Sequence, residues 1–284
     1  MTRSIGVAHL SALGLEPHEL IHAASEAGFD FVGLRVLPAT PTEVMAPVHP
    51  GSAALVAAER ALAETGLRVL DVEFLPLTAQ TRRETWMPAL EAGAVLGARA
   101  FTVTGADADE ARLTDTLAAL AADAREVGIR PLLEPISYNA VSRVADAARI
   151  AAAAGAGVMI DALHMARGDN PLADIAALDP DLLPVVQLCD GPAEPDAALR
   201  VDAPLPRGMS AQGSPRMLEA RAVRSAPGEG AFDLHALLDA LPADIPLSLE
   251  APNAFAHARL GAAGWLTHLR ETTERLLAAR EVAA

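Results

Sequence analysis

Short apolar runs alternate along the chain with longer stretches rich in alanine and leucine. Runs such as Phe31-Val32-Gly33-Leu34 and Val158-Met159-Ile160 are continuously apolar, which is typical of parallel strands buried on both faces. This pattern predicts strands at 4–9, 29–35, 68–75, 99–104, 129–135, 157–161, 183–189 and 246–251. Helices are predicted near 16–27, 51–65, 82–97, 107–127, 140–154, 171–178, 232–241 and about 256–281.

Glycines stand at several of the expected turns from helix to strand, where helices commonly end. These glycines are Gly28, Gly66, Gly97, Gly128 and Gly155. Eight alternations of strand and helix predict a single (β/α)8 TIM barrel. The alternative is an open doubly wound sheet, which usually has fewer strands and a glycine-rich first turn. The first strand here runs instead into His9-Leu10-Ser11.

No change in composition divides the chain, so we expect one domain over residues 1–284. The segment 190–231 breaks the rhythm, because it is long, rich in Pro, Gly and Arg, and without helical period. It follows the seventh strand, at the end of the barrel where active sites lie. Long loops in compact domains are usually functional lids or disordered. We favour the interpretation that this segment is a lid that covers the substrate. The alternative is a mobile insertion.

Composition and charge exclude several classes of function. All 22 basic residues are arginines, so a Schiff-base mechanism through lysine is excluded. A formal net charge of −15 argues against nucleic acid or an anionic membrane as a partner. The single cysteine, Cys189, rules out intrachain disulfides and fits a reducing compartment. Without an apolar signal segment or a run long enough to span a bilayer, we expect a cytoplasmic protein.

Polar residues follow the apolar strands, at the ends that face the mouth of a barrel. In chain order they are His9, Arg35, Glu73, Thr104, Glu134, Asp161, Gln187 and Glu250. The last four are oxygen donors, and buried carboxylates are costly unless a cation pairs with them. We therefore predict one divalent metal ion bound by Glu134, Asp161, Gln187 and Glu250. Oxygen ligands favour Mn²⁺ or Mg²⁺ over Co²⁺ or Zn²⁺.

Each of these residues also has a plainer interpretation. A carboxylate at a strand end often caps the next helix or pairs with an arginine. Glu73 and Arg35 are candidates for lining the substrate site, or they form a mutual salt bridge. His9 is a further lining candidate, from the barrel floor or the first loop.

Two residues outside the strand ends are candidates for direct substrate contact. His164 lies three residues after Asp161 and is either structural or a proton-transfer group. Arg224 precedes Pro227-Gly228-Glu229-Gly230 and is either solvated or in contact with substrate.

At these residues the chain resembles the xylose isomerase-like barrels, also called sugar phosphate isomerases/epimerases. This superfamily also includes hydroxypyruvate isomerase, inosose dehydratase, 3-dehydroshikimate dehydratase and endonuclease IV. The resemblance extends over nearly the whole chain. The motifs are Leu133-Glu134-Pro135, Asp161-Ala-Leu-His164 with Arg167 and Gly168, Gln187-Leu-Cys-Asp190, Pro227-Gly-Glu-Gly230 with Asp233, and Leu249-Glu250.

The resemblance implies the same four metal ligands, with His164 and Arg224 as substrate contacts. Gln187 departs from the epimerases, which usually have histidine there, and is similar to the 3-dehydroshikimate dehydratases. The endonuclease alternative fails, because its three-zinc cluster needs histidines where this chain has Glu73 and Thr104.

The expected function is a metal-dependent isomerase or epimerase of a keto sugar or related cyclic hydroxy-ketone. A chelating metal lowers the pKa of the α-proton, which Glu134 and Glu250 can remove and return from different sides. Loss of a β-hydroxyl would make the same site a dehydratase, with His164 as acid or base. A non-catalytic sugar-binding barrel is the alternative from another class. The sequence does not decide between a monomer and a homodimer.

Overall fold

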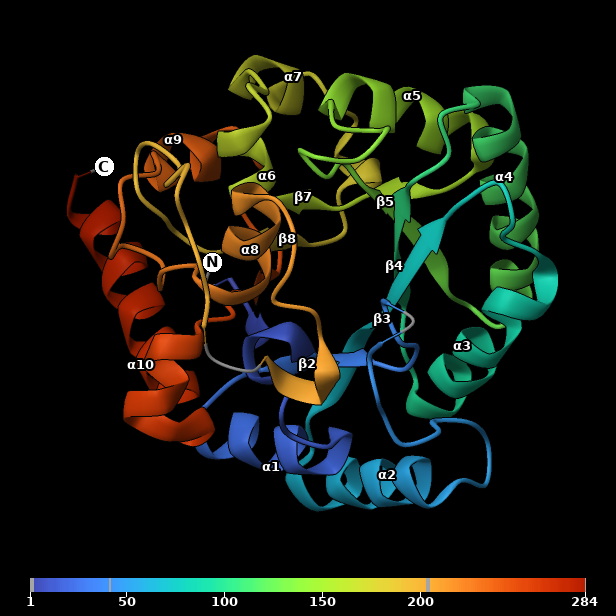
Figure 1. Cartoon of the computed structure of the whole chain (residues 1–284), viewed down its shortest axis with the longest axis horizontal. Coiled ribbons are helices and arrows are strands. Elements are labelled where there is room, and N and C mark those ends of the chain that lie inside the picture. The colour runs from blue at the N-terminus through green and yellow to red at the C-terminus, as the bar shows by residue number, and fades with distance from the viewer. Residues whose placement is uncertain (1–2, 41, 203–204, 284) are drawn as a thin grey trace.

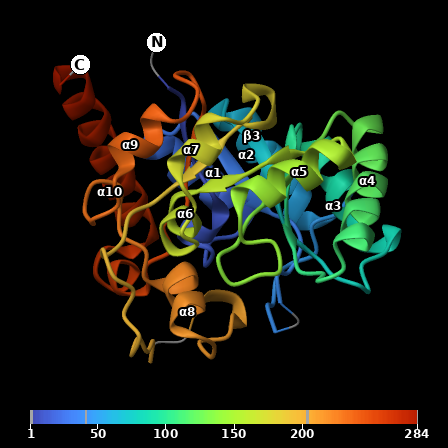
Figure 2. The same ribbon diagram turned by 90° about the horizontal axis from the view of Figure 1, so that it is seen from above.

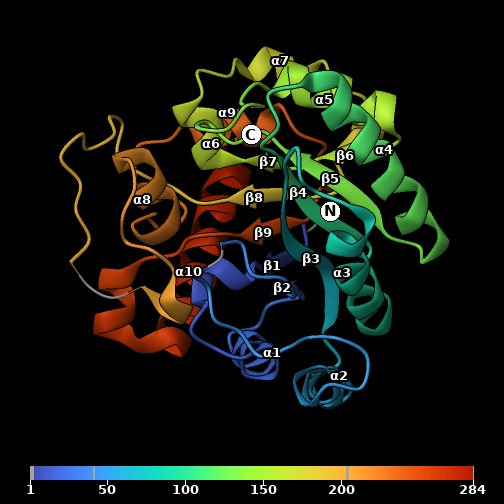
Figure 3. The same ribbon diagram turned by 45° about the vertical axis from the view of Figure 1, so that its right-hand side comes forward.

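The computed structural model describes residues 3–40, 42–202 and 205–283. Parallel strands form a ring at the centre, and helices surround it (Figure 1, Figure 3). The strands are β1 (Ile5–Val7), β2 (Phe31–Arg35), β3 (Arg68–Leu77), β4 (Ala100–Gly105), β5 (Arg130–Glu134), β6 (Gly157–Val158), β7 (Ile160–Asp161), β8 (Val186–Leu188) and β9 (Leu247–Leu249).

The strand order confirms the (β/α)8 barrel. It runs β6-β5-β4-β3-β2-β1-β9-β8-β7, and every paired register is parallel. Met159 alone separates β6 from β7, so the sixth predicted strand is present in two pieces and the ring nearly closes between them. The N–H of Met159 still donates to the carbonyl of Leu133 on β5, at 3.2 Å.

Each of the eight predicted helices is present close to its expected span, and α6 and α8 are helices that the sequence did not predict. They are α1 (Pro17–Glu26), α2 (Ala53–Thr65), α3 (Arg83–Leu96), α4 (Glu110–Glu126), α5 (Val144–Ala154), α6 (Ala162–Arg167), α7 (Leu172–Ala176), α8 (Pro215–Ala222), α9 (Leu234–Asp239) and α10 (Ala254–Ala283). Short 3-10 helices are η1 (His9–Ala12), η2 (Pro180–Leu182) and η3 (Pro206–Gly208). Gly66 and Gly155 end α2 and α5 with φ angles of 73° and 72°, a backbone conformation that other residues rarely adopt.

An apolar layer inside the barrel supports the site. It consists of Ala100 on β4, Leu132 on β5, Met159 between β6 and β7, and Val185 just before β8. Two residues further along the chain stand Thr102, Glu134, Asp161 and Gln187. Because side chains two residues apart in a strand share a face, these polar groups lie above the apolar layer, toward the carboxyl ends of the strands. The interior is therefore closed by hydrocarbon below and polar at the mouth.

The segment 190–231 is more ordered than its sequence indicated. The expectation that it lacks helix is wrong, because it contains η3 and the eight-residue helix α8. Its apolar side chains form a small core with Leu13 of the first loop; the members from the segment are Val201, Leu205, Met209, Leu218 and Ala222. Figure 2 shows α8 projecting from one end of the barrel. Among the described residues, no helix has the length and apolar character needed to cross a bilayer.

Candidate active site

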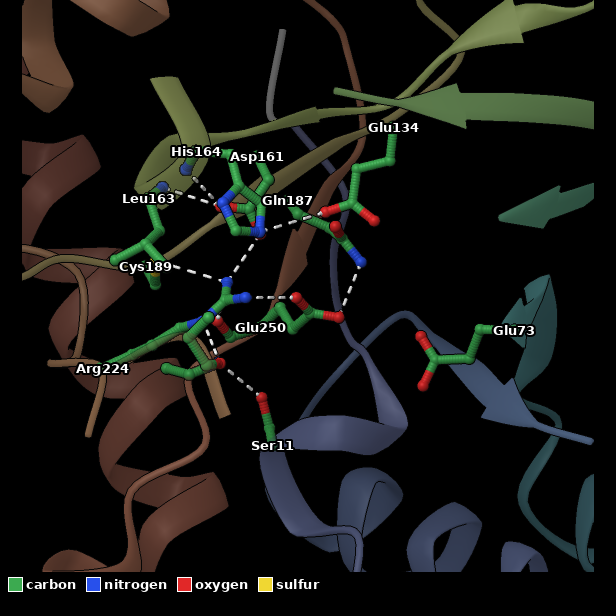
Figure 4. A network of polar contacts seen from close by, with 12 residues as sticks. Ser11, Glu73, Glu134, Asp161, Leu163, His164, Gln187, Cys189, Arg224 and Glu250 are labelled. Carbon is green, nitrogen blue, oxygen red and sulfur yellow. Dashed lines mark hydrogen bonds and ion pairs between the residues drawn. The ribbon is translucent and has the colours of Figure 1, made fainter. Parts of the chain in front are cut away.

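The four oxygen donors expected at the strand ends gather at the mouth of the barrel (Figure 4). Glu134 ends β5, Asp161 ends β7, Gln187 lies within β8 and Glu250 follows β9. All four are buried, with at most 6% of any of them exposed. Their convergence comes from the parallel strands, which bring residues far apart in the chain to the same edge.

Arg224 lies between two of these carboxylates. Its Nη1 is 2.6 Å from Oδ2 of Asp161, and its Nη2 is 2.9 Å from Oε2 of Glu250. Nη1 also donates to the backbone carbonyl of Glu250 at 3.0 Å, and Nε donates to that of Ala220 at 2.8 Å. The guanidinium is only 2% exposed, so the solvated alternative for this arginine is wrong.

Asp161 has both of the plainer roles of a strand-end carboxylate. Its Oδ1 accepts hydrogen bonds from the backbone N–H groups of Leu163 and His164, at 2.7 and 3.2 Å, and so caps α6. Its Oδ2 pairs with Arg224. Burial alone would raise the pKa of Asp161, but Arg224 and His164 hold it below its ordinary value. Asp161 is therefore ionised at neutral pH.

Glu134 and Gln187 present oxygens that are not fully used. Gln187 donates from Nε2 to Oε1 of Glu250 at 2.9 Å, while its buried Oε1 has no hydrogen-bond partner among the described residues. Oε1 of Glu134 lies 3.7 Å from Nε2 of His164. Ligand atoms of Glu134, Asp161 and His164 lie within 4.8 Å of one another, close enough to reach one ion.

The charges of this cluster do not balance within the protein. Burial raises the pKa of Glu134 well above its ordinary value, and the charges of Glu250 and Asp161 raise it further. Burial also raises the pKa of Glu250 to about 8, although Arg224 opposes that effect. Three carboxylates face one guanidinium, so full ionisation leaves two negative charges in excess. A divalent cation would remove that excess, and the unpartnered Gln187 oxygen suits it. The donor set therefore fits a divalent metal.

His164 is held as a neutral imidazole. Burial lowers its pKa to about 4. The backbone N–H of Ser137 points at its Nδ1 from 3.4 Å, and the Ser137 hydroxyl lies 3.2 Å from the same atom. Tyr138 packs its ring edge-on, with centroids 5.6 Å apart. If Nδ1 accepts from Ser137, the proton lies on Nε2 and faces Glu134.

Residues of β2 and β3 and of nearby segments form a second buried polar cluster. The mutual salt bridge given as the alternative for Arg35 and Glu73 is present, with Nε and Oε1 3.4 Å apart, and Glu43 also pairs with Arg35 at 3.3 Å. Burial raises the pKa of Glu73 although Arg35 opposes that effect. His9 accepts from the N–H of Arg35 at 3.0 Å and contacts the carbonyl of Leu15 at 2.9 Å. Both of its ring nitrogens are thus engaged by backbone.

A pocket of about 820 Å³, including its open mouth, lies over the cluster. Of the predicted site residues, those that line it are Arg35, Glu134, His164, Arg224 and Glu250. Those that do not are His9, Glu73, Asp161 and Gln187. The outer wall of the pocket was not predicted from the sequence, and it includes Phe74, Tyr138, Met217 and Arg221. Met217 and Arg221 are four residues apart on α8, a spacing that would have indicated a shared face had the segment been interpreted as a helix.

The chain was compared with protein families and solved structures. A family model described as xylose isomerase-like TIM barrel matches residues 21–271. The IOLI protein, in a structure with a zinc atom, is 15% identical, with a TM-score of 0.68 over 95% of this chain and 96% of that one. The 3-keto-D-glucoside 4-epimerase of E. coli is 19% identical, with a TM-score of 0.65 over 95% and 100%. The D-allulose 3-epimerase of Methylomonas sp. is 15% identical, with a TM-score of 0.67 over 98% of each chain. No curated protein matches.

Proposed function

The chain belongs to the xylose isomerase-like TIM barrel family, and we propose that it is a divalent-metal-dependent isomerase or epimerase of a hydroxy-ketone of the keto sugar type. One observation carries the proposal. The buried carboxylates Glu134, Asp161 and Glu250 lie together beside an amide oxygen that has no hydrogen-bond partner among the described residues, and a single arginine offsets only part of their charge. The likeness in fold to epimerases that act on keto sugars supports the reaction class.

A metal ion would be held by Glu134, Asp161, Gln187 and Glu250. When bound, it would polarise a substrate carbonyl and make the neighbouring C–H more acidic. Glu134 and the Gln187 amide oxygen have room for this task, because neither accepts a hydrogen bond from a described residue. Asp161 and Glu250 already accept from Arg224, so the ion and the guanidinium would share their oxygens.

The proton transfers are assigned to the two glutamates. Glu134 approaches the pocket from the end of β5 and Glu250 from the end of β9. Burial raises the pKa of both carboxyls, which makes each a stronger base than it would be in water. One removes the α-proton, and the other returns a proton at the same or the adjacent carbon. His164, with Nε2–H directed into the site, can donate to a substrate oxygen during that exchange.

A second candidate reaction is the loss of water. If the substrate carries a hydroxyl one carbon beyond the acidic C–H, removal of the proton can be followed by departure of that hydroxyl as water. His164 would supply the departing proton. Gln187 favours this candidate. The epimerases usually have histidine at this position, whereas glutamine here is similar to the pattern of the 3-dehydroshikimate dehydratases.

Nuclear magnetic resonance in D₂O tests the proposal. Protein loaded with Mn²⁺ would be incubated with keto sugars and cyclic hydroxy-ketones, the manganese removed, and deuterium at the α-carbon measured. Chelator-treated protein is the control. Deuterium in an isomer of the starting compound supports the isomerase. A product that has lost water supports the dehydratase, and deuterium in the recovered substrate shows that proton removal is reversible. Tight metal binding without any exchange would favour a non-catalytic sugar-binding barrel instead.

A further inference from the structure

We propose that Arg221 binds a carboxylate of the substrate, so that the pocket takes an acidic hydroxy-ketone in preference to a neutral sugar. The inference rests on the proposed function for the reacting end of the ligand. The observations that carry the inference itself come from the outer wall of the pocket, which includes Met217 and Arg221 of α8.

Arg221 is placed to meet a ligand. It lies on α8, at the barrel end that carries the site, and lines the pocket together with Met217 one turn earlier. It also lines an adjoining pocket beside Leu205 and His257, so it stands where the two cavities meet. Its side chain is half-buried rather than extended into solvent.

The pairing of the neighbouring arginines sets Arg221 apart. Arg35, Arg167 and Arg224 are each at least 95% buried, and each forms ion pairs with one or two buried carboxylates. Arg221 forms no hydrogen bond or ion pair with any residue in the described part of the chain. The chain has 37 acidic residues for 22 basic ones, so acidic partners are plentiful. An arginine that faces a pocket without one offers its donors to a ligand.

The surroundings favour a carboxylate over a phosphate. A guanidinium matches the two oxygens of a carboxylate in a bidentate arrangement. Phosphate carries more charge and usually needs several cations or a cradle of backbone N–H groups. The other arginines that line the pocket, Arg35 and Arg224, already have carboxylate partners, and the chain has no lysine.

Apolar residues of the pocket wall would separate the two polar ends of a ligand. Phe74, Ile136, Met209 and Met217 line the pocket with apolar surface that offers no competing charge. A ligand with its hydroxy-ketone at Glu134 and Glu250 would therefore find one cationic partner for a second polar end, at Arg221. A neutral sugar would leave that cation without a partner.

Binding to the Mn²⁺-loaded protein tests this inference. Isothermal titration calorimetry would compare D-fructuronate with its methyl ester, with D-fructose and with D-fructose 6-phosphate, and 3-dehydroshikimate with its methyl ester. We expect at least one acid to bind about tenfold or more tightly than its neutral partner, because a charge-assisted pair is lost in the ester. Arg221→Gln should reduce that preference to about twofold or less. Arg216→Gln is the matched control, since Arg216 lies on the same helix but is exposed, and it should keep the preference.

Three outcomes would overturn the inference: no acid binds better than its neutral partner, Arg221→Gln keeps the preference, or only the phosphate ester binds better. Deuterium exchange measured on the same samples separates this inference from the proposed function. Exchange without an acid preference rejects the role of Arg221 and retains the isomerase. An acid preference that Arg221→Gln removes, without exchange on any ligand, retains the subsite and rejects the isomerase.

Discussion

Replacement of Arg224 by methionine should make the stability of the barrel depend on metal. The guanidinium is the cation that pairs with Asp161 and Glu250, at 2.6 and 2.9 Å, inside a site from which water is largely excluded. Methionine retains the length and apolar stem of the side chain but leaves both carboxylates without this partner. The metal-free variant must then bury uncompensated charge or take up protons.

The expected loss is large. Removal of one partner from a buried ion pair costs about 3–5 kcal/mol, because the remaining charge stays buried. At roughly 2–4 °C per kcal/mol, the melting temperature of the metal-free variant should fall by roughly 6–20 °C. Metal should restore most of that loss. Mn²⁺ at one hundred times its dissociation constant stabilises the unmodified protein by about 2.7 kcal/mol. The gain in the variant should be larger by at least about 1.4 kcal/mol, which corresponds to tenfold tighter binding without a competing guanidinium.

Urea unfolding at pH 7.5, with chelator and with Mn²⁺, measures the free energy of unfolding that the variant loses and the part of it that metal restores. Arg167→Met is the matched control, because Arg167 is also buried and pairs with Glu219 at 2.6 Å, outside the proposed ligand set. It should lose stability equally with and without metal. If metal rescues neither variant, or rescues both alike, Arg224 and the ion do not share the same oxygens and the charge argument is refuted.

Three further predictions concern other buried groups. Glu250→Gln should abolish deuterium incorporation while circular dichroism stays unchanged, because an amide cannot accept the proton; surviving exchange would remove Glu250 as a base. The free energy of unfolding of the metal-free protein, measured in urea, should fall as pH rises from about 5 to 8. Burial raises the folded-state pKa of Asp71 to about 7 and that of Glu250 to about 8. The folded state therefore binds more protons than the unfolded state in this range, and it loses that advantage as the pH rises. Asp71→Asn should weaken that slope, and an unchanged slope would assign it to other groups. Cys189 should react with iodoacetamide only after unfolding, because burial raises the pKa of its thiol; fast labelling of folded protein would contradict this.

The barrel could be predicted because its strands are buried on both faces and its helices have one apolar face. Those patterns are local, so they appear in the sequence without knowledge of the partner. Helix α8 is different, because Leu218 and Ala222 are buried in a cluster that includes Leu13, about two hundred residues earlier in the chain. Helix α6 was not predicted either, because its six residues are too few to show a helical period, although a strand-end carboxylate such as Asp161 was expected to be able to cap a following helix.

The site shows the same division between local and distant information. The rule that parallel strands end at one edge identified the residues that gather there. It could not show that Gln187 donates to Glu250, or that Arg224 lies between two of the expected ligands, since both contacts join residues from separate elements. It also could not show that backbone groups occupy both nitrogens of His9.

The position of Arg224 connects the folding of the barrel with its chemistry. A barrel that folds without an ion buries Glu134, Asp161 and Glu250 together, and an internal cation lowers the cost of doing so. The same guanidinium lines the pocket, within reach of a ligand at the two glutamates. Once a divalent ion neutralises the carboxylates, Arg224 is no longer needed as their only counter-charge. We therefore expect its N–H groups to contact substrate oxygens only at the reacting end of the ligand, beside the two glutamates, in the metal-loaded protein, while the second polar end is left to Arg221. This reconciles the expected substrate contact with the ion pairs seen in this structure.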